Sequence, residues 1–322
     1  MKKIYPDRIK KKANPLVKEV WESKLKQAPR ANKHISYSQL STFSNCQRQW
    51  YLQYVKKLAP YQPSIHATFG TAFHETLQTW LEVLYHDKVK TANEMDLHSL
   101  LYENMIKAYK SGKAQNGHDH FSNEKELTQF WLDGKHILDF IKKKRSIYFG
   151  TKTMKLAGVE TLLYQQIKPG VVFKGLVDLV FYHPNTDTWT VMDIKTSTRG
   201  WNDTYKKNPN LTAQVILYRE FFAKQFNIDP SKINVEFFIV KRKLWEQSDF
   251  VQKRVQEFIP ASGPIKTKKA VGKMEEFIKE CFEPTGEIKE RVYARTPSAS
   301  ACKFCPFYEQ PRYCEHAGAK FK

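Results

Sequence analysis

The sequence lacks several features that would place it in other classes of protein. It has no apolar run near the ~20 residues that cross a bilayer, and no apolar stretch follows its basic beginning, Met1 to Ile4. It also has no G-x-x-x-x-G-K-[ST] phosphate loop, so a nucleotide-driven motor would have to be a separate chain. These absences predict a cytoplasmic protein with no membrane partner.

Acidic residues and cysteines are also scarce. The chain of 322 residues holds 33 Asp and Glu against 53 Lys and Arg, which gives a net charge of +20. Such an excess favours a polyanionic partner, usually nucleic acid, because neutralising phosphates releases bound counterions. The alternative is a chain that is basic only for solubility. With five cysteines in a reducing compartment, metal ligation or ordinary packing is expected in place of disulfides.

The hydrophobic pattern changes along the chain. Apolar side chains spaced by three and four residues predict helices, and period-two alternation between turn residues predicts strands. The predicted helices lie at 36–55, 73–84, 97–110, 124–148 and 210–226, and the predicted strands at 157–167, 171–183, 189–195 and 233–240. The first three strands should form an antiparallel meander. The predicted regions are a basic arm (1–33), a motif region (34–75), a helical insertion (76–150), a core (151–285) and a cysteine-containing tail (286–322).

Charged side chains interrupt two of the predicted strands. Asp178 lies in the second strand of the meander, and Asp193 and Lys195 lie two positions apart in the third. Because alternate side chains of a strand share a face, Asp193 and Lys195 project together while Ile194 points into the core. Aspartate and lysine are rarely buried without a partner, so the pattern indicates either a structural Asp–Lys pair or a functional site.

Pairing of these two strands would bring Asp178 near Asp193. Two carboxylates on one face raise each other's pKa unless a cation lies between them, and Mg²⁺ binds one or two carboxylates together with waters and phosphate oxygens. A neighbouring lysine can orient or deprotonate an attacking water and neutralise charge that develops on phosphate. Asp178, Asp193 and Lys195 therefore indicate the chemistry of phosphodiester hydrolysis.

Five motifs, in order along the chain, closely resemble those of the PD-(D/E)xK nuclease superfamily and its RecB-like branch. They are Ser36-Tyr37-Ser38 with Phe43 and Cys46, Gly70-Thr71-Ala72-Phe73-His74, Gly175-x-x-Asp178, Asp193-Ile194-Lys195-Thr196 and Gln214-x-x-x-Tyr218. The resemblance extends from residue 36 to residue 314. Asp193 stands where the family often has Glu, and Gln47 stands where it often has Pro.

The resemblance implies a restriction-endonuclease-like α/β core, with a central mixed sheet and flanking helices. The implied ligands of Mg²⁺ or Mn²⁺ are His74, Asp178, Asp193 and the carbonyl of Ile194. The implied catalytic residues are Asp178, Asp193, Lys195, Gln214 and Tyr218, of which the last two would position the scissile phosphate or support the lysine. The ordinary alternative for His74 and Tyr218 is core packing. Glu160 is a weaker candidate for a further metal carboxylate.

Cysteines near both ends of the chain suggest a second metal site. Cys302-x-x-Cys305 followed by Cys314 supplies three thiolates, and Cys46 is the natural fourth. One cysteine before the core and three after it is similar to AddB-type and CRISPR-associated RecB-like nucleases. This similarity implies a [4Fe-4S] cluster on the four thiolates, with Zn²⁺ as the alternative. Cys281 is expected to be a packed thiol.

The implied activity is that of a DNA exonuclease that acts on single- or double-stranded ends in recombination or repair. Two alternatives are a DNA-binding iron–sulfur protein without strong nuclease activity, and a nuclease subunit that a separate helicase or recombination complex recruits. The presence of His74, Asp178, Asp193 and Lys195 together argues against the first alternative.

Overall fold

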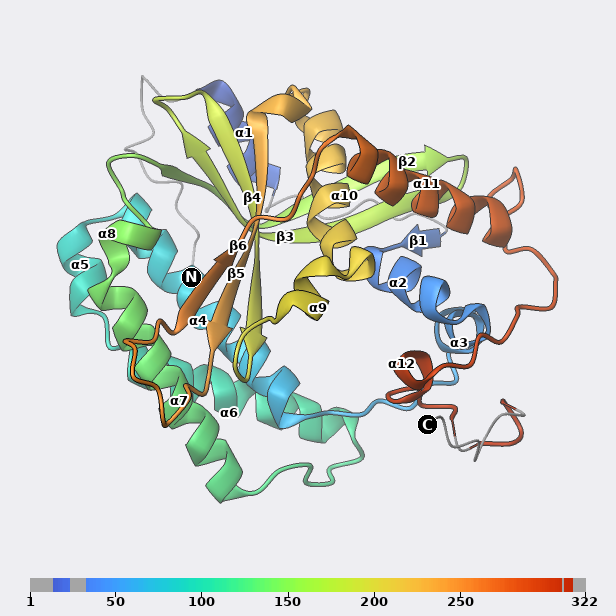
Figure 1. Cartoon of the computed structure of the whole chain (residues 1–322), viewed down its shortest axis with the longest axis horizontal. Helices are drawn as coiled ribbons and strands as arrows, with labels where there is room; N and C mark the ends of the chain where they lie inside the picture. The colour runs from blue at the N-terminus through green and yellow to red at the C-terminus, as the bar shows by residue number, and fades with distance from the viewer. Residues whose placement is uncertain (1–13, 24–32, 309, 315–322) are drawn as a thin grey trace.

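The computed structural model describes residues 14–23, 33–308 and 310–314. Its centre is a six-stranded mixed β-sheet with helices on both faces (Figure 1), which confirms the predicted fold class. The strands are β1 (Lys33–Ile35), β2 (Lys155–Lys168), β3 (Val171–His183), β4 (Thr188–Ser197), β5 (Ile233–Lys241) and β6 (Val255–Phe258). Within the described ranges, no helix is long and apolar enough to cross a membrane.

The sheet order is β1–β3–β4–β5–β6, with β2 paired to the other edge of β3. β2, β3 and β4 form the predicted antiparallel meander, and Gly170 supplies the positive φ of +72° in its first turn. β4 and β5 are parallel, and the crossover between them contains α10 (Pro209–Phe226). The sequence did not predict β1 and β6, because strands of three and four residues are too short to show alternation.

Helices from the first half of the chain cover one face of the sheet (Figure 1). They are α4 (Ile65–His86), α5 (Val89–Glu94), α6 (Leu97–Gln115), α7 (Glu124–Lys143) and α8 (Arg145–Tyr148). Their apolar sides form one core with sheet residues such as Leu179, Ile194 and Phe238. α4 begins at Ser64, whose side chain accepts a hydrogen bond from the Ala67 N–H and so caps the helix.

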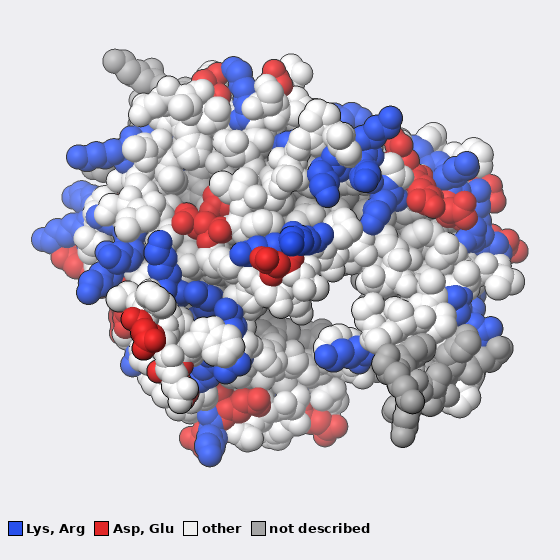
Figure 2. All heavy atoms as spheres, viewed as in Figure 1, with Lys and Arg blue, Asp and Glu red and all other residues white. Residues whose placement is uncertain are grey.

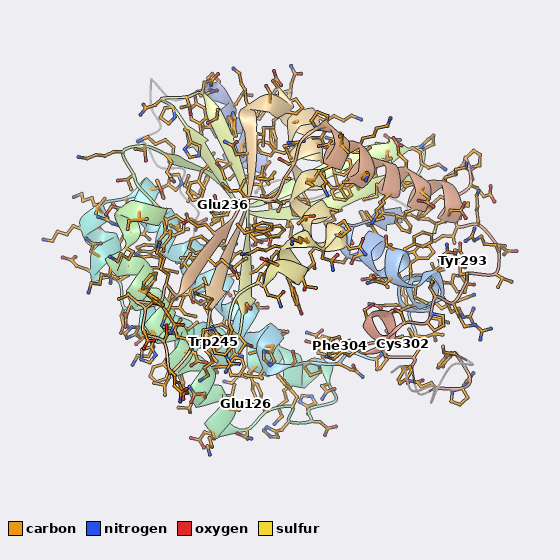
Figure 3. All side chains as sticks on the ribbon, viewed as in Figure 1. Glu126, Glu236, Trp245, Tyr293, Cys302 and Phe304 are labelled. Atoms are coloured by element: carbon orange, nitrogen blue, oxygen red, sulfur yellow. The ribbon has the colours of Figure 1, made fainter. Side chains whose placement is uncertain are left out.

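The opposite face carries helices from both ends of the chain. They are α1 (Pro15–Ser23), α2 (Tyr37–Asn45), α3 (Gln47–Trp50), the π-helix η2 (Tyr51–Val55), α10 and α11 (Pro264–Cys281); the short helices α9 (Asp203–Lys207), η3 (Pro230–Lys232) and α12 (Ala299–Cys302) complete the chain. Trp50 is buried at 1% exposure and contacts the rings of Phe43, Phe277 and Tyr293. This aromatic cluster joins the N-terminal motif region to the C-terminal part of the chain, where Figure 3 labels Tyr293.

The region predicted as a basic arm contributes one described helix. In α1, Val17 and Val20 are buried at 4% and 0% exposure, and the helix packs on β2. Residues 1–13 and 24–32 of the predicted arm lie outside the described residues.

One face of the molecule is deeply hollowed. Figure 2 shows an opening that side chains leave free, and Figure 1 shows that α9, α3, α12 and the beginning of α4 surround it. α9 follows β4 directly along the chain, so the opening lies beside the element that carries Asp193 and Lys195.

Glu236 on β5 is a half-buried carboxylate, labelled in Figure 3, whose Oε1 atom has no hydrogen-bond partner in the described part of the chain. Burial, and secondly the charge of Glu257, raises its pKa from 4.5 to about 7. A carboxyl group whose pKa is raised by folding is neutral at low pH, and its ionisation destabilises the folded state as the pH rises from about 4.5 through 7.

Glu236→Gln is therefore expected to raise the free energy of unfolding at pH 8 by up to about 3 kcal/mol, and this gain should shrink toward pH 4.5. Urea unfolding at several pH values measures the effect. Glu94→Gln removes an exposed partner of Lys90 and should change stability little at any pH. A gain for Glu236→Gln that does not depend on pH would contradict the assignment.

Candidate active site

The candidate site lies where β3 and β4 separate. β3 pairs with β4 only as far as Leu179↔Met192, and the same edge of β3 pairs with β1 at residues 171–173. Between these two ladders, residues 174–178 have no strand partner on that edge. Asp178 and Asp193 are the first residues beyond the last β3–β4 pair, so the divergence of the strands leaves room between their carboxylates.

Both carboxylates have one close partner. Asp178 Oδ2 accepts a hydrogen bond of 2.7 Å from the backbone N–H of Ile194. The carboxylate therefore does here what a backbone carbonyl of a neighbouring strand does within a ladder. Lys195 Nζ lies 2.7 Å from Asp193 Oδ2 in an ion pair; beyond this ion pair, that oxygen has no hydrogen-bond partner among the described residues. The Asp193 side chain is 3% exposed and that of Lys195 is 33% exposed, so only the amine reaches solvent.

His74 reaches the same point from α4, on the other face of the sheet. Its Nδ1 lies 3.6 Å from Asp178 Oδ2, and its ring is hydrogen-bonded to the backbone of Ile194. Burial, and secondly the charge of Lys195, lowers the pKa of His74 to about 4. The imidazole is therefore neutral near pH 7, which is the form that binds metal ions.

α10 places two polar side chains beside the lysine. Lys195 Nζ donates to Gln214 Oε1 at 3.0 Å, and Gln214 Nε2 donates to the Tyr218 hydroxyl at 3.3 Å. Gly175 on β3 makes room for this tyrosine, because a Cβ at that position would lie 3.0 Å from the tyrosine ring. The three side chains form a row that fixes the position of the amine.

Burial sets the charge state of the two carboxyl groups. The pKa of Asp178 is raised well above its ordinary value, first by burial and then by the charges of Asp193 and Glu160. Burial also raises the pKa of Asp193, although the amine of Lys195 opposes this shift. A cation that binds between the two carboxylates would favour their charged forms.

Two residues outside the predicted set complete one side of the site. Glu160 lies in β2 with a φ of +48°, which is unusual for a residue other than glycine. Gln78 on α4 donates to Glu160 Oε1 at 2.6 Å and to the Asp178 carbonyl at 3.3 Å. From the sequence, Glu160 is only a weaker candidate, and Gln78 is not singled out. The available signal for Gln78 is its position four residues after His74, on the same side of the helix.

Tyr37 was also missed as a site residue. Its hydroxyl is buried, and burial raises its pKa to about 12; the Ser41 side chain opposes this shift, and the charge of Asp193 adds a smaller contribution. It is the first residue of α2, directly after the capping Ser36. The motif Ser36-Tyr37-Ser38 is apparent in the sequence, but the sequence does not show that its central residue lies within electrostatic range of Asp193.

The comparisons with known proteins follow this geometry. The sequence profile of the PD-(D/E)XK nuclease superfamily matches residues 34–310. The chain belongs to this superfamily. No curated protein sequence matches it. Among solved structures, a crystal structure of a candidate exonuclease from Eubacterium rectale has a TM-score of 0.47 and 12% identity, and the match covers 83% of this chain and 91% of that chain.

As a member of the PD-(D/E)XK superfamily, the protein is a hydrolytic nuclease, and such nucleases typically use Mg²⁺ or Mn²⁺. Within the described residues, no group of three or more His, Cys, Asp or Glu side chains is arranged to hold a metal ion. The available donors nevertheless suit a hard divalent cation, since they are carboxylate oxygens and a neutral imidazole. Asp193 Oδ2 is buried and has only the Lys195 amine as a partner among the described residues, so it could also accept a cation.

The cysteines of this nuclease lie in two environments. Cys46, Cys302, Cys305 and Cys314 are half-buried free thiols, and Cys281 is fully buried in α11. Burial raises the pKa of Cys305, and smaller contributions come from the thiols of the other three half-buried cysteines, so all four lie within range of electrostatic interaction. Figure 3 shows Cys302 on α12, across from α3, the helix that begins beside Cys46.

Proposed function

We propose that the protein is a divalent-metal-dependent deoxyribonuclease that removes nucleotides from DNA ends. The observation that carries this proposal is the meeting of Asp178, Asp193 and Lys195 at the separation of β3 and β4, with His74 facing them from α4. A structural Asp–Lys pair alone would not need the half-buried histidine or the second, half-buried carboxylate, because removing polar groups from water is costly.

His74, Asp178, Asp193 and the carbonyl of Ile194 are the residues that would hold the cation. When bound, Mg²⁺ or Mn²⁺ polarises the scissile phosphate and lowers the pKa of water. The hydrogen bond from the Ile194 N–H to Asp178 orients that carboxylate, and burial keeps water from competing for it.

Lys195 is the proposed catalytic lysine. Its amine is free enough to reach a substrate at 33% exposure, yet Asp193 and Gln214 hold it on two sides. In this position it can orient the attacking water and neutralise charge that develops on the phosphate. Gln214 and Tyr218 act as positioning residues, because they reach the amine and the space beside it through one row of hydrogen bonds.

The net charge of +20 supports a polyanionic substrate. The decisive experiment compares linear DNA, labelled at either end, with a covalently closed circle of the same sequence in Mg²⁺ or Mn²⁺. We expect the linear molecule to be degraded from an end and the circle to remain intact. Equal cleavage of the circle would indicate an endonuclease, and binding without cleavage would favour the DNA-binding alternative.

We also propose that Cys46, Cys302, Cys305 and Cys314 bind a [4Fe-4S] cluster. The support is that Cys46, Cys302 and Cys314, half-buried thiols from both ends of the chain, lie within electrostatic range of Cys305, and four thiolates are the donor set that such clusters take. The link from Cys46 to Cys302 closes a loop of more than 250 residues (302 minus 46). Closing such a loop removes roughly 5 kcal/mol of chain entropy from the unfolded state, so the cluster would act as a staple.

The cluster proposal predicts a brown protein with broad visible absorbance and with iron and sulfide in equal amounts. Cys305→Ser should lose the iron and lower the melting temperature, while Cys281→Ser should keep the iron because that thiol lies in the core of α11. Metal analysis that finds stoichiometric zinc in a colourless protein would rule out the iron–sulfur cluster.

A further inference from the structure

We propose that the loop between β5 and β6 is a stacking platform for single-stranded nucleic acid beside the active site. This proposal rests on the proposed nuclease function and adds the form in which the substrate strand is held. The platform is defined here as Arg199 together with residues 242–254.

The loop presents apolar rings to solvent. Trp245 is 61% exposed, Phe250 is 83% exposed and the neighbouring Val251 is fully exposed. No other tryptophan in the described part of the chain is among its exposed large hydrophobic residues. Exposed rings that lie close together mark a binding surface more often than rings scattered singly.

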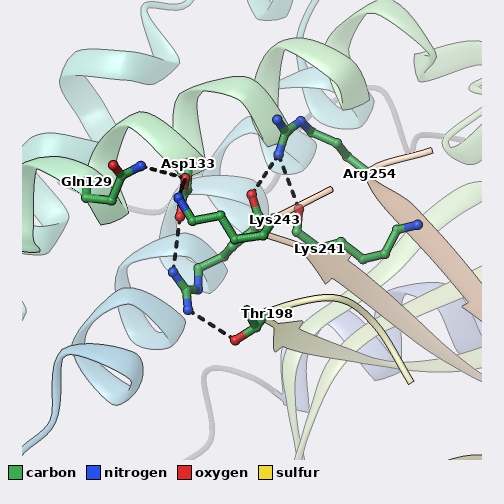
Figure 4. A network of polar contacts seen from close by, with 7 residues as sticks. Gln129, Asp133, Thr198, Lys241, Lys243 and Arg254 are labelled. Carbon is green, nitrogen blue, oxygen red and sulfur yellow. Dashed lines mark hydrogen bonds and ion pairs between the residues drawn. The ribbon is translucent and has the colours of Figure 1, made fainter. Parts of the chain in front are cut away.

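Hydrogen bonds within the loop fix the backbone that carries the Trp245 ring. The backbone N–H of Trp245 donates to Gln252 Oε1 at 2.8 Å, and Gln252 Nε2 donates back to the Trp245 carbonyl at 2.6 Å. At the base of the loop, Arg254 donates to the Arg242 carbonyl at 2.8 Å, and Arg242 pairs with the buried Asp133 at 3.0 Å (Figure 4). The rings are therefore carried on an anchored base, which lowers the entropy lost when a ligand stacks on them.

Arg199 gives the platform a charged group. Its guanidinium carbon lies 4.4 Å from the centroid of the Trp245 ring, and Arg199 and residues 244–250 line a hollow of about 570 Å³. A guanidinium that stacks on an aromatic ring can still bind a phosphate with its edge. Residues 242–254 contain four Lys or Arg and two acids, so with Arg199 the platform carries a net charge of +3 (five minus two). This charge suits a phosphodiester backbone whose bases stack on the rings.

The platform is close to the proposed catalytic lysine. Arg199 follows Lys195 by four residues, a span of at most ~14 Å for extended chain. The Lys243 N–H donates to the Thr198 carbonyl at 2.8 Å, which joins the loop to the segment that leaves β4. A strand whose bases rest on Trp245 can therefore enter the site within a few nucleotides. A single strand fits better than duplex because only unpaired bases expose their faces for stacking.

The test measures binding of a fluorescein-labelled oligo(dT) and of a blunt duplex to the full-length protein by anisotropy, in Ca²⁺ to slow hydrolysis. Trp245→Ala and Phe250→Ala should each weaken oligo(dT) binding about 10-fold and duplex binding much less. Arg199→Ala should lower the slope of log K against log salt by about 0.7, and Arg199→Lys should preserve that slope. Tyr102→Ala removes a ring that is 54% exposed on α6 and should leave both affinities unchanged.

The proposal is overturned if Trp245→Ala with Phe250→Ala binds oligo(dT) as tightly as the unaltered protein, or if single-strand and duplex binding fall equally. It is also overturned if the double variant changes only self-association in sedimentation velocity, since the rings would then serve a second copy of the chain. Thermal melts confirm that each variant is folded. Hydrolysis of linear DNA by the unaltered protein tests the nuclease proposal separately, because oligonucleotide binding does not depend on cleavage.

Discussion

Lys195→Ala is expected to lower kcat for DNA hydrolysis by about 10³-fold or more, because it removes both the group that orients water and the positive charge near the phosphate. The Lys195 amine lies 2.7 Å from Asp193 and 3.0 Å from Gln214. The Gln214 side chain is neutral, so it cannot supply the lost positive charge. Single-turnover cleavage of an end-labelled linear substrate measures the effect.

The affinity for Mn²⁺ distinguishes a catalytic role of Lys195 from a structural one. Lys195→Ala removes a positive charge beside Asp193, so the affinity of the protein for Mn²⁺ should be unchanged or stronger, as measured by calorimetric titration. Gln214→Ala should cause a smaller loss of kcat, because the lysine keeps its ion pair. The matched control is Lys232→Ala, which removes an exposed lysine paired with Asp187. Cleavage by Lys195→Ala at the rate of the unaltered protein would disprove the proposed active site.

Asp133→Ala is expected to destabilise the fold by about 3–5 kcal/mol, because it leaves a buried guanidinium without its anion. The side chains of Asp133 and Arg242 are 5% and 8% exposed, and their ion pair is 3.0 Å long. Lys243 Nζ and Gln129 Nε2 also donate to Asp133, at 3.1 Å and 3.0 Å, so one substitution removes three contacts (Figure 4). Urea unfolding followed by circular dichroism measures the loss.

Asp187→Ala breaks an exposed ion pair with Lys232, whose side chains are 53% and 49% exposed, and is expected to change stability by no more than about 1 kcal/mol. Because Arg242 begins the β5–β6 loop, Asp133→Ala should also expose that loop to proteolysis before the rest of the chain. Equal stability of the two variants would show that the network in Figure 4 contributes nothing beyond surface charge.

Much of the sheet could be predicted because its signals are local. Turn residues such as Pro169 and Gly170, and alternation along the strands, indicate β2, β3 and β4 without knowledge of the rest of the chain. β1 could not be predicted, because a strand of three residues exists only where β3 offers it an edge. The position of Tyr37 could not be predicted either, because it depends on where that short strand places α2.

The sequence by itself determined which chemical groups are present and which of them share a face. The spacing of Asp193 and Lys195 on one strand requires that both project together, and the order of the motifs indicates the superfamily. Only the tertiary structure decided that His74, more than 100 residues before Asp178, meets it at 3.6 Å, and that the β3–β4 ladder ends where the carboxylates need space. It also decided their pKa values, because the desolvation of a carboxyl group depends on everything packed around it and not on its neighbours in sequence.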